Sequence, residues 1–388
     1  MHGRLNPTVV AAKASVARHA PGSFGATIIK HAQQTAALEK LKFLLDHGEG
    51  YELICLVGPT GVGKSTLANR LLDDVVARER HAMFEDRDLV PVISTVAIAS
   101  GHRAFDWKVL YHDALVAVGE PLAMDRRPTP ESRERQFKNV GESLTGATLR
   151  LRLVEELRRR RVKYWFIDEA QHILMGARAG GAADQYDVLK SIAQSAGVKL
   201  ILIGTYQLLV HLQVSAQLAR RTEVVHFGRY GASDATDKNN FASCVSGLLQ
   251  RCGAEIVPNP IENFDFFYSG AVGCVGILKD WCARAMSRAK MAGRADLQIE
   301  DFRHTRLSGL AIKRIVEDIQ TGEDLASPDT DRRILSLVLG PAPSNRPTST
   351  SKPGASSAPG RRREVGVRSP TRDAVPAVPG GFVGGSHA

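Results

Sequence analysis

The sequence predicts an α/β fold in which a five-stranded parallel sheet lies between helices and is followed by a small all-helical domain. Five short apolar or β-branched runs alternate with helix-like segments, and this alternation ends near residue 233. A glycine-rich loop follows the first run directly and leads into a helix-like segment. The third run ends in two carboxylates, as a buried parallel strand does where it reaches a site.

The expected elements follow one another closely along the chain. Strands are predicted at 52–57, 90–99, 164–169, 199–203 and 223–227, and helices at 31–46, directly after the glycine-rich loop, at 105–118, around 149–157, around 188–193 and shortly before 221. Helical spacing returns around 241–249, 261–268, 276–291 and 310–319 without further strands. We therefore expect an amino-terminal arm (1–30), a nucleotide-binding domain (31–230), a helical lid (231–322) and a disordered Pro/Gly/Ser/Arg-rich tail (323–388).

Composition places the chain among globular proteins with a basic charge balance. The 388 residues are 43% apolar, and 51 Lys+Arg against 41 Asp+Glu give a net charge of +10. Half of this excess lies from Pro341 onward, and a polyanionic partner is an expectation that this basic end of the chain alone could also explain. The five cysteines form no C-x-x-C pair, which argues against a disulfide framework or a zinc site. The chain shows no membrane-length apolar run and no signal peptide, so we expect a cytoplasmic protein.

The glycine-rich loop has the pattern G-x-x-x-x-G-K-[ST], which is typical of a phosphate-binding loop. Its glycines allow backbone N–H groups to surround a polyphosphate, Lys64 reaches the outer phosphates, and the Ser65 hydroxyl is placed to bind Mg²⁺. The expected ATP-binding residues are Gly58, Pro59, Thr60, Gly61, Val62, Gly63, Lys64, Ser65 and Thr66. The alternative is a glycine-rich turn with a solvated lysine, which does not require the strand before it or the helix after it.

The carboxylates that end the third strand fit a second part of a nucleotide site. Asp168 is expected in the Mg²⁺ shell, and Glu169 is expected to polarise the attacking water. A helix N-cap pair is the alternative. Thr205, at the tip of the following strand, is a candidate sensor of the γ-phosphate or, alternatively, an ordinary residue at a strand end.

Together these features resemble the AAA+ ATPase module over residues 36–319, and within it the TniB/TnsC-type transposition regulators. The stretches that carry the resemblance are V-G-P-T-G-V-G-K-S-T at 57–66, I-D-E-A-Q-H at 167–172, L-A-R-R at 218–221 and G-C-V-G-I-L-K-D-W at 273–281. The first two occur in many AAA+ branches, and only the last two favour this family.

The resemblance implies an ATPase whose subunits assemble side by side, as a ring or a helical filament, with nucleotide between neighbours. Arg220 or Arg221 would then act as an arginine finger on the next subunit's nucleotide, or alternatively be ordinary surface charge. Lys279 stands where many AAA+ proteins keep a second sensor arginine, and it offers a point charge in place of a bidentate fork.

The resemblance also implies partners. Family members assemble on duplex DNA in the ATP state and recruit a transposase, in some cases with a target-selector protein, and hydrolysis marks disassembly. Candidate DNA contacts are His102, Arg103 and Lys108, and the basic residues Arg126, Arg127, Arg133, Arg135 and Lys138, which a solvated loop would also explain. The tail is a candidate tether for DNA or transposase, or only a solubilising segment.

Two other functions compete with this interpretation. A replication initiator or helicase loader of the AAA+ type would normally add a DNA-binding domain after the lid, and the sequence shows none before its low-complexity tail. A nucleotide-gated signalling switch would normally carry long repeat or effector domains. The run Arg158 to Arg161 is interpreted as the basic end of a helix in preference to a DNA site.

Overall fold

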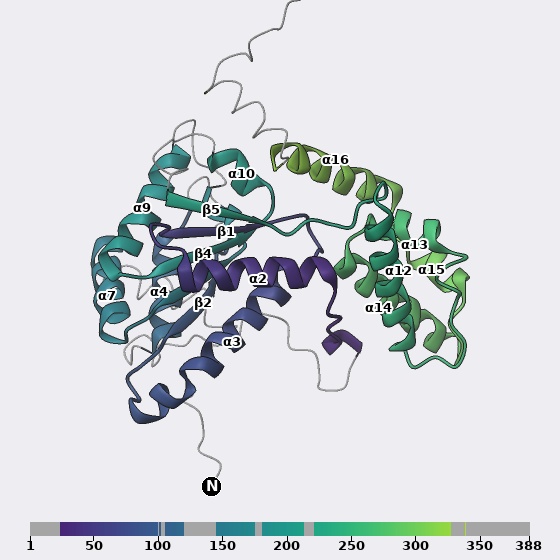
Figure 1. The fold of residues 1–388 in the computed structure, drawn as a ribbon, viewed down its shortest axis with the longest axis horizontal. Coiled ribbons are helices and arrows are strands. Elements are labelled where there is room, and N and C mark those ends of the chain that lie inside the picture. Colours follow the sequence, from purple (N-terminus) through teal and green to yellow (C-terminus); the bar gives the residue numbers. More distant parts are fainter. Residues whose placement is uncertain are drawn as a thin grey trace, which may run out of the picture. The chain divides into compact units, whose positions relative to one another are not determined.

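A parallel sheet of five strands forms the centre of the first domain (Figure 1). In the computed structural model the strand order is β2-β3-β4-β1-β5, and every neighbouring pair is parallel. The strands are β1 (Leu53–Val57), β2 (Val92–Val96), β3 (Tyr164–Asp168), β4 (Lys199–Gly204) and β5 (Thr222–His226). All five predicted strands are therefore confirmed, and the fold is the AAA+ P-loop α/β fold that the sequence predicted.

The structure describes residues 24–99, 101, 105–119, 145–174, 181–212, 221–326 and 338. Ser336–Ala388 form a unit separate from the rest, and of that unit only Val338 is described. Arg220, His102, Arg103 and the basic loop at 121–139 lie outside the described residues, so these predictions stay predictions.

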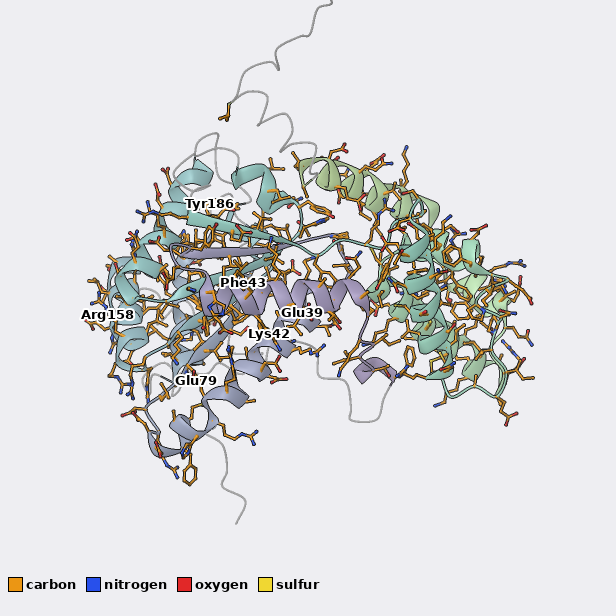
Figure 2. The ribbon with its side chains drawn as sticks, viewed as in Figure 1. Glu39, Lys42, Phe43, Glu79, Arg158 and Tyr186 are labelled. Atoms are coloured by element: carbon orange, nitrogen blue, oxygen red, sulfur yellow. The ribbon has the colours of Figure 1, made fainter. Side chains whose placement is uncertain are left out.

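Helices cover both faces of the sheet because the strands are apolar on both faces, and β1 is buried at every position. On one face β1, β3 and β4 share a core with helices α4 (Trp107–Val118), α7 (Gly146–Arg159), α9 (Gly181–Ala196) and the short α8 (Gln171–Leu174) and α10 (Gln207–Leu212). On the other face the core includes α2 (Ala32–His47) and α3 (Lys64–Glu85). Ion pairs such as Lys42 with Asp74 (2.6 Å) join α2 to α3 at the surface (Figure 2).

The second core is entirely helical, as predicted, and it contains α12 (Ala235–Gln250), α13 (Phe264–Ala271), α14 (Val275–Met291), α15 (Ile299–Thr305) and α16 (Gly309–Leu325). Trp281 of α14 is buried at its centre and donates from Nε1 to the Phe302 carbonyl (2.8 Å). The seven-residue α15 was not predicted, because about two turns with only Ile299 and Phe302 as large apolar side chains give little periodicity.

The lid differs from the expectation at both of its ends. Phe24 and Ile29, in the stretch expected to be an arm, pack against the lid core beside the 3₁₀ turn η1 (Phe24–Ala26). Helix α16 continues through the expected boundary at residue 322 to Leu325. It does so because Glu323 forms a paired hydrogen bond with Arg229, at 3.0 Å (Nε to Oε1) and 3.1 Å (Nη2 to Oε2).

The basic run at the end of α7 is engaged with acidic side chains of the same domain. Arg159 bonds to Glu156 (2.6 Å), Arg160 to Asp88 (2.5 Å) and Arg161 to Asp86. Arg158 points outward from α7 (Figure 2). These pairs support the interpretation of the run as a helix terminus. Among the described helices, none is both long enough and apolar enough to cross a bilayer. The five cysteines are buried and unbridged.

Candidate nucleotide-binding site

The phosphate-binding loop lies between the end of β1 and the start of α3, as the sequence predicted. Gly61 (φ +76°) and Gly63 (φ +110°) adopt the left-handed conformation that residues with a side chain rarely enter. Gly58 is required for another reason, because a Cβ there would lie 2.1 Å from the Phe227 carbonyl oxygen. The first N–H groups of α3 have no partner within the helix and are therefore available to an anion.

Lys64 is largely buried and is held inside its own loop. Its Nζ donates to the carbonyl oxygens of Gly58 (2.9 Å) and Pro59 (2.8 Å). Burial lowers the pKa of Lys64 to about 8, and the nearby carboxylates of Asp168 and Glu169 oppose that shift. The ammonium therefore lies near the two carboxylates that the sequence assigned to the same nucleotide site.

Asp168 ends β3 next to the loop helix. The Ser65 hydroxyl donates to its carboxylate, and burial raises the pKa of Asp168 in spite of this bond. Ser65, Asp168, Asn69 and Ser94 line one small recess. A hydroxyl and a carboxylate in contact are hard oxygen donors of the kind that Mg²⁺ prefers when phosphates complete its shell. The residues present therefore fit the magnesium ion that accompanies ATP, and Ser65 and Asp168 would hold it.

Glu169 follows Asp168 with an unusual backbone, because its φ of +52° lies in the left-handed region. Its carboxylate accepts a hydrogen bond from Gln171 Nε2 (2.5 Å). Thr205, at the tip of β4, donates its backbone N–H to Gln171 Oε1 (3.3 Å). The Thr205 hydroxyl oxygen is buried and has no hydrogen-bond partner among the residues that the structure describes. The predicted catalytic carboxylate and the predicted sensor are therefore joined by one side chain.

A groove beside the loop has a volume of about 510 Å³. Pro59 and Thr60 of the loop, Gln171, Thr205 and residues of α16 line it. The groove therefore joins the loop to Thr205 and to Gln171, which follows the carboxylates of β3, as expected where parallel strands share a carboxyl edge.

The lid contacts the loop through the start of α14. Ile277 donates its N–H to the Gly61 carbonyl (3.1 Å), and a Cβ on Gly276 would lie 2.3 Å from the same oxygen. Lys279, which lies one turn after the first residue of α14, instead donates from Nζ to the Gly25 carbonyl (2.6 Å). Sequence reasoning selected Lys279 and did not assign a role to Gly276 or Ile277, although both lie in the stretch that carried the resemblance.

Arg221 lies at the opposite edge of the sheet from its own loop. It precedes Thr222, which pairs with Leu53 at the start of β1, whereas the loop begins after Val57. Its guanidinium bonds to Glu52 (3.0 Å), just before β1. A strand of this length separates the two edges by roughly 15 Å. Arg221 therefore does not belong to the site built by its own loop.

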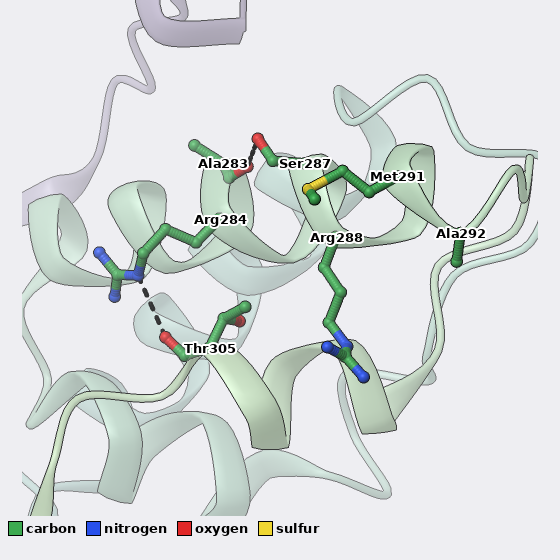
Figure 3. A pocket seen from close by; sticks show the side chains of 7 residues that line it. All are labelled: Ala283, Arg284, Ser287, Arg288, Met291, Ala292 and Thr305. Carbon is green, nitrogen blue, oxygen red and sulfur yellow. Dashed lines mark hydrogen bonds between the residues drawn. The ribbon is translucent and has the colours of Figure 1, made fainter.

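Another hollow lies on the lid between α14 and α15 (Figure 3). Arg284 donates from Nε to the Thr305 carbonyl (3.1 Å), and Arg288 lies 3.5 Å from the Asp301 carboxylate. The residues that line this hollow are Ala283, Arg284, Ser287, Arg288, Met291, Ala292 and Thr305. None of these residues is part of the phosphate-binding loop or of the strand ends that form the candidate site.

Comparison with known families agrees with this geometry. Residues 47–212 match the family model described as AAA domain. This segment of the chain is similar to the AAA domain family. The matched segment contains the phosphate-binding loop, Asp168, Glu169 and Thr205, and it excludes the lid and Arg221. ATP is the nucleotide that this domain binds and hydrolyses.

Individual relatives of the AAA+ domain are distant. The chain is 25% identical over 257 residues to the hemin import ATP-binding protein HmuV of Hahella chejuensis (strain KCTC 2396), covering 62% of this chain and 95% of that protein. The Aeropyrum pernix ORC1 protein, solved in complex with DNA, is 19% identical with a TM-score of 0.48, covering 71% of this chain and 65% of that one. Cdc6p from Pyrobaculum aerophilum is 17% identical with a TM-score of 0.46, covering 73% and 69%. The chain spans about two thirds of the length of both solved proteins.

Proposed function

We propose that this protein is an ATP-dependent regulator of DNA transposition that assembles on duplex DNA. In the ATP state its subunits associate side by side on DNA without sequence preference and recruit or activate a transposase. Hydrolysis releases the assembly. The proposal joins the ATPase site of the AAA+ domain to the resemblance in the stretches at 218–221 and 273–281.

The observation that carries the self-assembly is the position of Arg221. An arginine at the amino-terminal edge of the sheet is too far from its own loop to touch that loop's nucleotide, and about 41% of its side chain is exposed beside Glu52, where a neighbouring subunit could approach it. A head-to-tail contact brings this edge of one subunit to the loop of the next, and such contacts generate rings or filaments. Arg221 or its neighbour Arg220 then stabilises the charge that develops during phosphoryl transfer.

Within one site the side chains have separate tasks. Lys64 exchanges its two loop carbonyls for phosphate oxygens, and Ser65 and Asp168 hold the magnesium ion of the substrate. That ion neutralises charge on the phosphates when it is bound. Glu169 accepts a proton from the attacking water, and the Thr205 hydroxyl, which has no partner within the described part of the chain, donates to the terminal phosphate.

Binding to DNA is proposed to depend on phosphate contacts from basic loops. Lys108 lies in the first turn of α4 and follows His102 and Arg103 closely in the sequence. Contacts to phosphates give affinity that falls steeply with salt and carry no sequence information. Reversing the charges at Arg103 and Lys108 should therefore weaken binding to every duplex equally and reduce its salt dependence.

Sedimentation with non-specific duplex DNA tests the proposal, with ATP, ADP or no nucleotide. We expect multimers on DNA only with ATP, lost in Lys64→Ala and persistent in Glu169→Gln, which binds ATP without hydrolysing it. Arg158→Glu, on the outer surface of α7, is the control for charge loss outside the proposed DNA loops. A protein that stays monomeric on DNA with every nucleotide would overturn the proposal and favour a nucleotide-gated switch.

A further inference from the structure

Gln171 is a buried polar residue at the centre of the site, although its side chain has no part in the activity described so far. Only 5% of it is exposed, between the carboxyl ends of β3 and β4. A buried amide keeps its place only if its donors and acceptor are used. Its Nε2 donates to Glu169 Oε2 (2.5 Å), and its Oε1 accepts from the Thr205 N–H (3.3 Å).

The surrounding backbone is shaped to hold this amide. The Ala170 N–H donates to the Ile203 carbonyl (2.9 Å), and His172 Nδ1 lies 2.9 Å from the Ala97 carbonyl oxygen. These bonds fix the residues on either side of Gln171 to β4 and to the end of β2. The main chain around Gln171 is therefore tied to two strands of the sheet, which leaves its side chain one direction to point.

Gly204 provides the space for the Gln171 side chain. A Cβ at position 204 would lie 2.3 Å from Gln171 Oε1 and 2.8 Å from Leu208 Cδ1. Its φ is not in the left-handed region, so the backbone conformation does not demand a glycine there. A side chain at position 204 would instead displace the Gln171 amide oxygen, which is the end of a flexible side chain. Gly204 therefore leaves room for the amide where it now lies.

Glu169 needs such a support. Its backbone φ of +52° is unfavourable for a residue with a side chain, and strained residues at sites persist where neighbours over-determine them. The Glu169 side chain is exposed, and within the described part of the chain Gln171 is the one side chain that donates a hydrogen bond to its carboxylate. Without that bond the carboxylate would be free to rotate away from the phosphate side.

We infer that Gln171 is a positioning residue for ATP hydrolysis: its amide aims the Glu169 carboxylate at the attacking water and couples that carboxylate to the Thr205 end of β4. The inference rests on the proposed role of Glu169. A shift of β4 on contact of Thr205 with the terminal phosphate is transmitted through Oε1 to Nε2, and thus to the catalytic carboxylate. Gln171 itself touches neither the nucleotide nor the water.

The variants Gln171→Ala and Gln171→Glu separate positioning from folding. Removing the amide leaves ATP affinity within about threefold of wild type and lowers kcat at least about tenfold, because the base stays present but is misdirected. In Gln171→Glu two carboxylates face each other, and their repulsion turns Glu169 away from the water, so kcat falls at least as far as in Gln171→Ala with ATP affinity again close to wild type.

Asn259→Ala is the matched control. Asn259 makes the same two bonds in an exposed turn of the lid, donating from Nδ2 to Glu262 (2.7 Å) and accepting from the Ile261 N–H (3.0 Å). Its loss should leave kcat and ATP affinity unchanged. Basal ATP hydrolysis without DNA is measured for each variant, together with ATP affinity and thermal midpoint.

Two results distinguish the possible failures. If Glu169→Gln abolishes hydrolysis and Gln171→Ala leaves kcat within twofold of wild type, the role of Gln171 is wrong and that of Glu169 stands. The same holds if kcat, ATP affinity and the thermal midpoint fall together in Gln171→Ala and in Gln171→Glu. If Glu169→Gln still hydrolyses ATP at the wild-type rate, the proposed role of Glu169 fails, and the inference fails with it.

Discussion

Lys64 shows how burial sets the chemistry of a single side chain in this site. The ammonium is held by two carbonyl oxygens of its own loop, and burial lowers its pKa to about 8. Phosphates favour the charged form, so the pKa rises when ATP binds. At pH values above 8 the free protein must therefore take up a proton to bind ATP, and the affinity falls as the pH rises.

The first prediction concerns this proton. Between pH 7.5 and pH 9 the Kd for a non-hydrolysable ATP analogue should rise about tenfold, as linkage requires for one group with a free-state pKa near 8. The measurement is a titration by calorimetry in buffers of different ionisation enthalpy, which also reports proton uptake. Lys64→Arg is the matched variant, because its guanidinium stays charged over this range. A Kd for wild type that is constant across the range would contradict the assigned pKa shift.

The residues of the site were predicted unevenly, for a physical reason. Lys64, Ser65 and Asp168 belong to local patterns in which spacing alone places the chemistry, and the structure brings them together. Gln171 gave no such signal, because its role depends on Thr205, which is 34 residues away in sequence and adjacent only through the pairing of β3 with β4. The burial of a polar side chain can be recognised only from the folded structure.

At the scale of elements, the junction between α14 and the phosphate-binding loop depends on two glycines. Gly61 has no room for a Cβ because Ile277 Cγ1 would lie 2.6 Å away, and Gly276 has none because of the Gly61 carbonyl, 2.3 Å away. The lid helix and the loop can approach this closely only without side chains. A movement of the loop on ATP binding should therefore displace the start of α14 directly.

The second prediction tests that contact. Gly276→Ala should lower the free energy of unfolding by about 1–3 kcal/mol through overpacking, and should weaken ATP binding because the loop is displaced. Gly309→Ala, at the first turn of α16 with nothing near its Cβ position, is the control. It should be neutral or stabilising by up to about 1 kcal/mol, since alanine favours helices. Equal effects of both variants in chemical denaturation and ATP titration would refute the contact.

The third prediction concerns the link between α16 and the end of β5. The paired bond of Arg229 with Glu323 is partly buried, so Glu323→Gln should cost about 1 kcal/mol of stability. Glu317 lies on the same helix and pairs with Arg314 (3.4 Å) in an exposed setting. Glu317→Gln should change stability by less than about 0.5 kcal/mol. Urea unfolding of both variants is the measurement, and a larger effect at Glu317 would reverse the assignment.

Elements with long apolar patterns were predicted well, and those held by contacts distant in sequence were not. The strands appear as buried runs, so their positions could be predicted to within a few residues. The packing of Phe24 and Ile29 on the lid and the extension of α16 to Leu325 both depend on partners from other parts of the chain. Local periodicity carries no information about such partners.

At the scale of the whole molecule, the two halves of the proposed shared site lie at opposite edges of the sheet. The loop, Asp168 and Glu169 lie at the carboxyl edge, and Arg221 lies at the amino edge. The central claim is that a neighbour's arginine completes each ATPase site. A monomer should then hydrolyse ATP slowly, and hydrolysis should rise with protein concentration and with DNA.

Mixing two inactive variants tests this claim most directly. Glu169→Gln lacks the catalytic carboxylate, and Arg220→Ala combined with Arg221→Ala lacks both candidate fingers. Where an arginine-deficient subunit provides the loop and a Glu169→Gln subunit provides the arginines, an intact site forms. When equal amounts of the two variants are mixed in a head-to-tail assembly, one pairing in four gives an intact site. About a quarter of wild-type ATPase activity should therefore return. No return of activity at any mixing ratio, with both variants co-assembling on DNA, would contradict the account.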